Sequence, residues 1–486
     1  MNSSTPSHRA ALTTPSAPPL ERRLGLLQAT ALNMANMLGA GPFITLSAVL
    51  SALGGPQSML GWFIAVLITL PDGMIWAELG AALPGSGGTF RYLREGFGAQ
   101  TWGRLMAFLF LAQLLVSGPL EIASGFIGFL RYADYLWQGV QARGWSSEPL
   151  IRDDLPTRSG AAVILVLGIS VVALLYRRIG SVGRLMVALW MGVVLTMLIV
   201  LIEGALHFNP KIAFALPPNA FHLSYGFFLG LGVAARTGIY DLLGYYDICY
   251  LGDEVKNPDL TIPRSILWSL GLVTLMYVGF ELSVIGVLPW QSFVPESAHP
   301  ESMYVVSAFM EHLHGPAVAR WFTVLILWTC FGGSFALLLG YSRIPYAAAQ
   351  EGVFFRVFGR LHPRGGFPHL ALLLLGGLSV AGSFLRFGVV LDTLIALRIV
   401  VQFLGQIGAV ILLRKHQPNR VRPYRVWFYP IPLVVAGVGW LFALGTTPSE
   451  VLWFSLGALI VGVITFLVWS WQTAQWPFKG RNSTHA

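Results

Sequence analysis

The sequence predicts an all-α polytopic membrane protein with twelve transmembrane helices. Charged residues make up 11% of the chain and hydrophobic residues 55%, whereas a soluble domain carries roughly 25% charged residues. Twelve apolar runs, each near the roughly 20 residues that cross a bilayer, follow one another through the sequence. They leave little length for a soluble domain, so the lipid bilayer is the expected surroundings of most of the chain.

Short segments rich in Pro, Gly and charged residues separate the runs and set the ends of each span. We expect the spans at 27–53, 57–83, 104–131, 160–176, 183–206, 223–251, 265–288, 318–343, 368–385, 389–413, 428–446 and 450–472.

Lys and Arg are unevenly distributed between alternate loops. With the amino terminus in the cytosol, 22 of the 31 Lys and Arg residues fall in cytosolic segments and 7 in outer segments. This bias predicts that both termini are cytosolic in a plasma (cytoplasmic, inner) membrane. The charges are spread over the inner face and not gathered in one patch, so no nucleic acid partner is expected. Residues 1–23 are predicted to be a disordered cytosolic tail and not a signal peptide.

Gly39, Ala40, Gly41, Pro42 and Phe43 interrupt the first span near its middle. Glycine weakens a helix by about 1 kcal/mol relative to alanine, and an interior proline removes a hydrogen bond. In hydrocarbon the freed backbone groups need partners, so such a break persists only where protein or a cavity surrounds it. The stretch is therefore either a kink or a binding site.

The end of the second span, Ala77–Gly98, combines a helix end, a Pro/Gly turn and an amphipathic cationic segment expected at the inner surface. This string resembles a signature of the amino acid–polyamine–organocation (APC) superfamily of permeases. Further strings resemble later elements of the same family, in the same order along the chain. They are Glu254–Pro258 with Ile262–Arg264, Ser342–Gly352 and Arg422–Val426.

The resemblance implies a five-plus-five inverted repeat, with helices 1 and 6 broken. The first repeat is then 24–206 and the second 207–413, followed by helices 11 and 12 in 414–472 and a cytosolic tail at 473–486. It also implies a secondary active transporter that works by alternating access.

A repeat of this kind predicts an interruption in the sixth span that matches the first. That span contains Tyr240, the carboxylate of Asp241 and Gly244 within its apolar run. Because paired interruptions indicate a transporter site, we interpret Gly39–Phe43 as a binding site. In the family the substrate carboxylate is held at the first break, and an aromatic residue at the second break, here Tyr240, closes over the site.

Broken helices suit an amino acid because each break exposes helix ends at the bilayer midplane. A helix N-terminus offers N–H groups and positive charge to a carboxylate, and a C-terminus offers carbonyls to an ammonium group. Pro42 suits the first turn of the outer half-helix. Gly39 and Gly41 let a ligand approach the backbone closely.

Several ionisable residues lie inside the predicted spans. Inserting each of them at the centre of a membrane helix costs about 2.5–3.5 kcal/mol. Each is either functional or part of a structural ion pair. Asp241 lies on the second break, and a break can bring Arg236 to it; Arg398 can pair with a core acid or with Asp392. The residues concerned are Asp72, Glu121, Glu203, Arg236, Asp241, Glu281 and Arg398.

Two of these carboxylates lie in strings that resemble the polyamine-uptake branch of the family. Ser117–Ala123 contains Glu121, and Tyr240–Gly244 contains Asp241. Two carboxylates near one cavity suit a cationic substrate by direct pairing, and they suit a proton relay equally well.

We therefore expect a secondary active transporter of amino acids, with a polyamine or a cationic amino acid as the alternative substrate. Coupling to a proton, to sodium or to exchange stays open. Cys249 and Cys330 are expected to be buried thiols. The sequence has no Walker loop, metal-ligand cluster or nucleophile elbow, so neither enzyme activity nor a cofactor or bound metal is expected.

Overall fold

Helices make up nearly all of the regular structure in the computed structural model, which describes residues 22, 24–85, 87–176, 179–363 and 365–478. The only strands within these ranges are β1 (Ile151–Arg152) and β2 (Leu155–Pro156), which form an antiparallel pair. The predicted all-α class is therefore confirmed. Of the two predicted tails, 1–23 lies outside the described residues except for Arg22 and 473–486 lies outside them beyond residue 478.

The first half of the chain forms a row of long helices joined by short segments. In order they are α1 (Leu26–Met37), α2 (Gly41–Leu53), the short η1 (Pro56–Met59), α3 (Leu60–Ala82), α4 (Thr89–Gly96), α5 (Trp102–Ala142), α6 (Arg158–Leu175), α7 (Ile179–His207) and α8 (Pro210–Ala213).

The second half begins with α9 (Tyr225–Leu242), which is followed by two short 3-10 turns, η2 (Asp247–Tyr250) and η3 (Gly252–Glu254). The remaining helices are α10 (Pro258–Ile285), α11 (Val305–His314), α12 (Pro316–Tyr341), α13 (Arg343–Gln350), α14 (His369–Gly382), α15 (Phe387–Arg398), α16 (Leu404–His416), α17 (Ile431–Gly445) and α18 (Ser449–Gln472). A π-helical turn, η8 (Ile399–Phe403), joins α15 to α16.

Several of the described helical segments are long and apolar enough to cross a membrane. Eight helical segments satisfy this on their own, and α1 with α2 forms a ninth that is bent by 49° at its break. α9, α14 and α17 overlap the other three predicted spans but are shorter or less apolar. The described helices thus cover every predicted span, while the count of twelve crossings and the repeat boundaries stay predictions.

Helix starts follow the local sequence. The Ser224 hydroxyl accepts a hydrogen bond from Phe227 N at 3.2 Å and caps α9, and Thr157 caps α6 through Gly160 N at 3.3 Å. Pro258 and Pro316 occupy the first turns of α10 and α12, where a missing N–H is harmless. These caps fix where the long helices begin.

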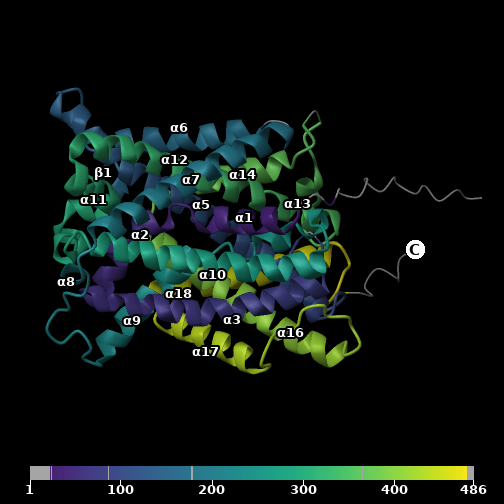
Figure 1. The fold of residues 1–486 in the computed structure, drawn as a ribbon. Coiled ribbons are helices and arrows are strands. Elements are labelled where there is room, and N and C mark those ends of the chain that lie inside the picture. The colour runs from purple at the N-terminus through teal and green to yellow at the C-terminus, as the bar shows by residue number, and fades with distance from the viewer. Residues whose placement is uncertain (1–21, 23, 86, 177–178, 364, 479–486) are drawn as a thin grey trace, which may run out of the picture.

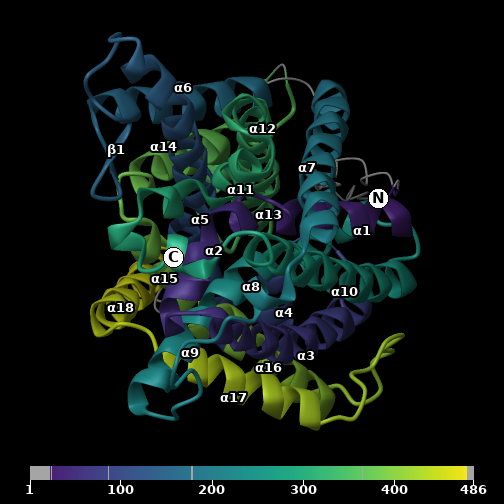
Figure 2. The same cartoon turned by 60° about the vertical axis from the view of Figure 1, so that its left-hand side comes forward.

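α1 and α2 lie end to end near the middle of the bundle (Figure 1). α1 packs against α10, and α2 packs against α9. α5 contacts α12, α14, α15 and α18 on the other side of the bundle (Figure 2). From Gly41 to Leu50 every residue of α2 except Ala48 is buried, so the first break lies in the protein core and not against lipid.

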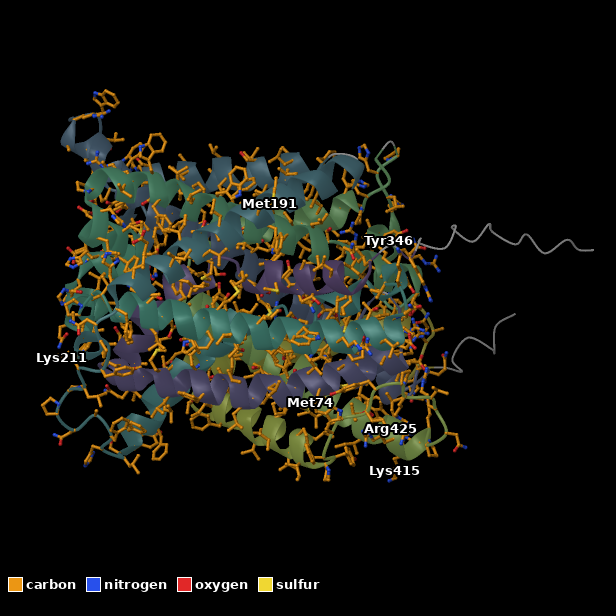
Figure 3. All side chains as sticks on the ribbon, in the orientation of Figure 1. Met74, Met191, Lys211, Tyr346, Lys415 and Arg425 are labelled. Carbon is orange, nitrogen blue, oxygen red and sulfur yellow. The ribbon has the colours of Figure 1, made fainter. Side chains whose placement is uncertain are left out.

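The two ends of the bundle carry different labelled residues in Figure 3. Lys415, Arg425 and Tyr346 lie at one end, and Lys211 lies at the opposite end, with Met74 and Met191 between them. The sequence predicts that Lys415 and Arg425 lie inside and Lys211 outside, and this orientation stays a prediction.

Candidate functional site

The first break separates α1 from α2 at Leu38–Ala40. α1 ends at Met37, and Pro42 lies in the first turn of α2, as the sequence predicts. The Tyr277 hydroxyl donates a hydrogen bond to the Met37 carbonyl, which provides a partner for a carbonyl at the end of α1. The predicted stretch Gly39–Phe43 therefore spans a true interruption at Leu38–Ala40 and the first turn of α2, and the freed Met37 carbonyl has a partner within the protein.

The second break begins directly after α9. The helix ends at Leu242, Leu243 is extended, and Gly244 has φ of +106°. A Cβ on residue 244 would lie 3.1 Å from Asn36 Cβ and 3.2 Å from Met37 N. Glycine is needed here both for the backbone angle and for the close approach, so the two breaks lie against each other.

Asn33 of α1 joins the two breaks. Its Nδ2 donates to Tyr245 O at 2.7 Å, and its Oδ1 accepts from Ile248 N at 2.9 Å. Asn36, one turn later, donates to Asp247 Oδ2 at 2.7 Å. Sequence reasoning missed both asparagines, although two amides one turn apart in an apolar span are a usable signal.

A small cavity lies between the breaks. Its volume is about 30 Å³. One water needs roughly 10–15 Å³, so the cavity fits water but not an amino acid. Its lining consists of Asn36, Met37, Gly39, Ala40, Gly41, Glu121, Ser124, Gly125, Tyr240, Asp241, Leu243, Gly333, Ser334 and Leu337.

A larger hollow of about 900 Å³ lies on the outer side of α5, α15 and α18. Its lining combines aliphatic residues, Leu115, Val116 and Val389 among them, with the charged residues Asp154, Arg386, Asp392 and Glu450. No residue of either break lines this hollow, so the smaller cavity at the breaks is the candidate site.

Asp241 brings a carboxylate to the cavity. Its side chain is buried, and Oδ2 accepts a hydrogen bond from Thr45 Oγ1 at 2.8 Å. Oδ1 has no hydrogen-bond partner among the described residues. A Cβ on Gly41 would lie 3.3 Å from Asp241 Cγ, so the carboxylate lies against the positive end of α2.

Tyr240 closes another side of the cavity. Its hydroxyl lies 2.6 Å from Ser124 Oγ, and Ser124 Oγ donates to the Glu121 carbonyl at 2.5 Å. The ring stands edge-on to Phe387 at a centroid distance of 6.1 Å. The predicted aromatic residue therefore lies at the second break, tied to α5.

Glu121 and Arg398 form a buried ion pair at the cavity edge, with 2.5 Å between Glu121 Oε2 and Arg398 Nη2. Arg398 also donates to Ser117 Oγ at 3.3 Å and to the Tyr246 and Tyr341 hydroxyls at 3.2 Å each. Because this network satisfies the Glu121 charge, Glu121 is not a free acid in the cavity.

Arg236 lies apart from the cavity lining. Its Nε donates to Asp392 Oδ1 and its Nη1 to Thr446 Oγ1, both at 2.8 Å. The expectation that the break brings Arg236 to Asp241 is therefore wrong, because the guanidinium points from α9 toward α15 and α17. Arg398 takes a core acid and not Asp392, which was the other of its two expected partners.

Some of the remaining predicted site residues line the cavity and others do not. Gly39, Ala40 and Gly41 line the cavity, whereas Pro42, Phe43 and Gly244 are not among its lining residues. The Phe43 ring packs edge-on against Phe280, with 5.3 Å between the ring centroids. The Phe43 carbonyl accepts a hydrogen bond from the Tyr132 hydroxyl at 2.6 Å. These three residues shape the breaks and do not face the cavity.

Two further expectations concern cysteines and metals. Cys249 and Cys330 are buried free thiols, as predicted. Across the residues that the structure describes, no group of three or more His, Cys, Asp or Glu side chains could hold a metal ion.

A model of the amino acid permease family matches residues 24–468, which is most of the chain. The chain belongs to the amino acid permease family. This permease is therefore an integral membrane transporter of amino acids and not an enzyme, and the APC resemblance of its sequence strings is confirmed.

Curated relatives of this permease match over most of its length. A serine/threonine exchanger of Bacillus subtilis is 24% identical over 88% of this chain and 91% of its own. A branched-chain amino acid permease of the same organism is 25% identical over 93% and 91%. Cationic amino acid transporter 4 of Mus musculus is 27% identical over 79% of this chain but only 57% of its own.

Proposed function

We propose that this permease carries amino acids by alternating access around the cavity between its two breaks. It does so with twelve crossings, a five-plus-five inverted repeat and both termini in the cytosol of a plasma membrane. The observation that carries the proposal is the unpartnered Oδ1 of Asp241, a buried carboxylate oxygen in the cavity lining.

The charge balance of the cavity supports binding of an ammonium group. Glu121 is neutralised by Arg398, whereas no basic side chain is among the cavity-lining residues. A buried carboxylate needs a charged partner, and an amino acid supplies one as its ammonium group. The substrate carboxylate then lies at the N–H groups of Gly39–Gly41, where the positive end of α2 favours an anion.

The small volume of the cavity supports a carrier and not a channel. At about 30 Å³, the cavity leaves no room at this point of the described bundle for a continuous polar pore. A substrate enters only when α1, α2 and α9 move apart on one side. The Gly333 face of α12 completes the wall, because a Cβ on Gly333 would lie 3.1 Å from Gly39 Cα.

A cationic substrate is the second candidate. The unmatched charge of Asp241 favours a cationic amino acid or a polyamine, since either brings positive charge to the cavity. One relative, from Mus musculus, is named a cationic amino acid transporter. Competition by lysine, arginine and spermidine against a neutral amino acid separates these substrates.

The test is counterflow in proteoliposomes that contain the purified protein. We expect saturable exchange of an amino acid by the wild type and its loss or altered specificity in Asp241→Asn. Asp153→Asn is the matched control, because Asp153 is exposed in a turn with φ of +53°, which Asn adopts readily. Linear, non-saturating flux, or wild-type exchange by Asp241→Asn, would contradict the proposal. Repeating uptake with a sodium gradient and then a pH gradient assigns the coupling ion.

A further inference from the structure

Glu281 of α10 is a buried carboxyl group that the proposed substrate site does not use. It is fully buried, and its Oε1 accepts a hydrogen bond from Trp62 Nε1 at 2.6 Å. Its Oε2 has no hydrogen-bond partner in the part of the chain that the structure describes. The buried guanidinium groups of Arg236 and Arg398 are bound elsewhere, so neither neutralises Glu281.

Glu281 lies close to Asp241. Trp62, its hydrogen-bond donor, also packs on α9, where a Cβ on Gly238 would lie 3.5 Å from Trp62 Cδ2. Gly238 is one turn before Asp241. The Trp62 ring therefore lies between the turn of α9 that leads to Asp241 and the carboxyl group of Glu281.

Tyr277 links Glu281 to the first break. It precedes Glu281 by one turn of α10, on the same face of the helix. Its hydroxyl donates to the Met37 carbonyl at the end of α1. Glu281 is thus behind the wall of the cavity and not in its lining.

The charged groups on the neighbouring helices are engaged with other partners. α1 and α2 contain no Asp, Glu, Lys or Arg. On α3, Asp72 accepts hydrogen bonds from the Tyr245 hydroxyl at 2.6 Å and Trp440 Nε1 at 3.1 Å. On α9, Arg236 is paired with Asp392, and the Tyr240 hydroxyl is hydrogen-bonded to Ser124.

Among the side chains that the structure describes, the other elements that pack against α10 bring no free cation either. On α7, Glu203 Oε2 lies 3.0 Å from His314 Nε2 and 3.6 Å from His207 Nδ1. On η2, Asp247 accepts from an asparagine of α1, and Lys211 of α8 is exposed. On α10 itself, Asp259 and Arg264 belong to the first two turns, far from Glu281 along the helix.

We propose that Glu281 is a proton-binding site and that the carrier closes around its substrate only when Glu281 is protonated. This rests on the proposed role of Asp241. In the loaded, closed carrier the substrate ammonium compensates Asp241, and nothing but a proton compensates Glu281. Closing over an ionised Glu281 would bury an unpaired charge next to a second carboxylate, which is far less favourable than taking up a proton.

The positive end of α2 decides which acid takes the proton. Asp241 lies against Gly41 at that end and accepts from Thr45, so its negative charge is stabilised there. Glu281 has only the Trp62 N–H. The proton therefore adds to Glu281 from water while the carrier is open and returns to water when the carrier opens again, and the substrate is chemically unchanged.

The test is the pH profile of counterflow, with the same pH on both sides of the proteoliposome membrane. Glu281→Gln holds this position in a neutral form and keeps an oxygen for the Trp62 hydrogen bond. We expect wild-type exchange to fall as the pH is raised and the Glu281→Gln profile to lose this alkaline fall. Glu203→Gln is the matched control, because its carboxylate lies with two histidines at the end of α7, and it should keep the wild-type profile.

A second measurement covers the case in which Glu281→Gln does not fold. The infrared carbonyl band of a protonated carboxyl group should be present in wild-type protein at low pH and disappear over the pH range in which exchange falls. The Glu203→Gln protein, which keeps Glu281, should lose the band over the same range. A wild-type profile without an alkaline fall, a band that does not change with it, or an unchanged fall in Glu281→Gln would overturn the proposal. Absence of exchange at every pH would instead refute the proposed function, and the infrared band would still test Glu281.

Discussion

Arg398 of α15 and Glu121 of α5 form an ion pair in the protein core, with 2.5 Å between Nη2 and Oε2. The Tyr341 hydroxyl donates to the same Glu121 oxygen, and the Arg398 guanidinium lies 5.7 Å from the Tyr341 ring centre. The pair holds α5, α12 and α15 together at the cavity edge. It also leaves Asp241 as the unmatched charge among the residues that line the cavity.

Removing one member of this pair should destabilise the protein. Glu121→Gln leaves Arg398 buried and uncompensated, which costs about 3–5 kcal/mol for a buried pair. We expect a clear fall in the apparent melting temperature in detergent. The double variant Glu121→Gln with Arg398→Gln should recover part of that loss. A single variant as stable as the wild type would show that the pair contributes nothing.

Adding one methyl group at Gly41 should weaken substrate binding. The new Cβ would contact the Asp241 carboxylate, and overpacking of this kind costs about 1–3 kcal/mol. We expect a higher Kd for Gly41→Ala in a scintillation proximity assay, and complete loss for Gly41→Val. The matched control is Gly271→Ala in α10, where nothing lies within 4 Å of the added Cβ. Equal affinities for the two alanine variants would rule out a substrate site at the first break.

The Tyr240 hydroxyl and Ser124 should act as a unit. Tyr240→Phe and Ser124→Ala each remove the 2.6 Å hydrogen bond between α9 and α5, worth about 0.5–1.5 kcal/mol. We expect each variant to raise KM by roughly two- to tenfold, and the double variant to add little to either. Fully additive effects in the cycle would mean that the two groups contact the substrate independently.

Arg236 should matter for stability and not for substrate affinity. Arg236→Gln leaves Asp392 without its partner and loosens the contact between α9 and α15. We expect a lower apparent melting temperature, with KM close to the wild-type value in counterflow. A changed KM with unchanged stability would instead make Arg236 part of the binding site.

Membrane orientation can be tested with single introduced cysteines, because both native cysteines are buried. Lys415 and Lys211 are exposed and lie at opposite ends of the bundle (Figure 3). In intact cells an impermeant maleimide should label Lys211→Cys but should label Lys415→Cys only after permeabilisation. The reverse pattern would place both termini outside.

The sequence predicts the helix breaks better than the side-chain partners. Gly39–Phe43 and Gly244 could be located because glycine and proline act through the local backbone, and a break needs no knowledge of distant contacts. The partner of Arg236 could not be found in this way, since Asp392 is 156 residues away along the chain. The partners of Asn33 could not be found either, because they lie in the turn after α9.

The amide of Asn33 has a mechanical consequence. Its side chain hydrogen-bonds the backbone of Tyr245 and Ile248, so α1 and the turn that follows α9 are held together as one rigid unit. A rotation of either element should therefore rotate the other with it. Movement of either break should therefore shift both walls of the candidate cavity together.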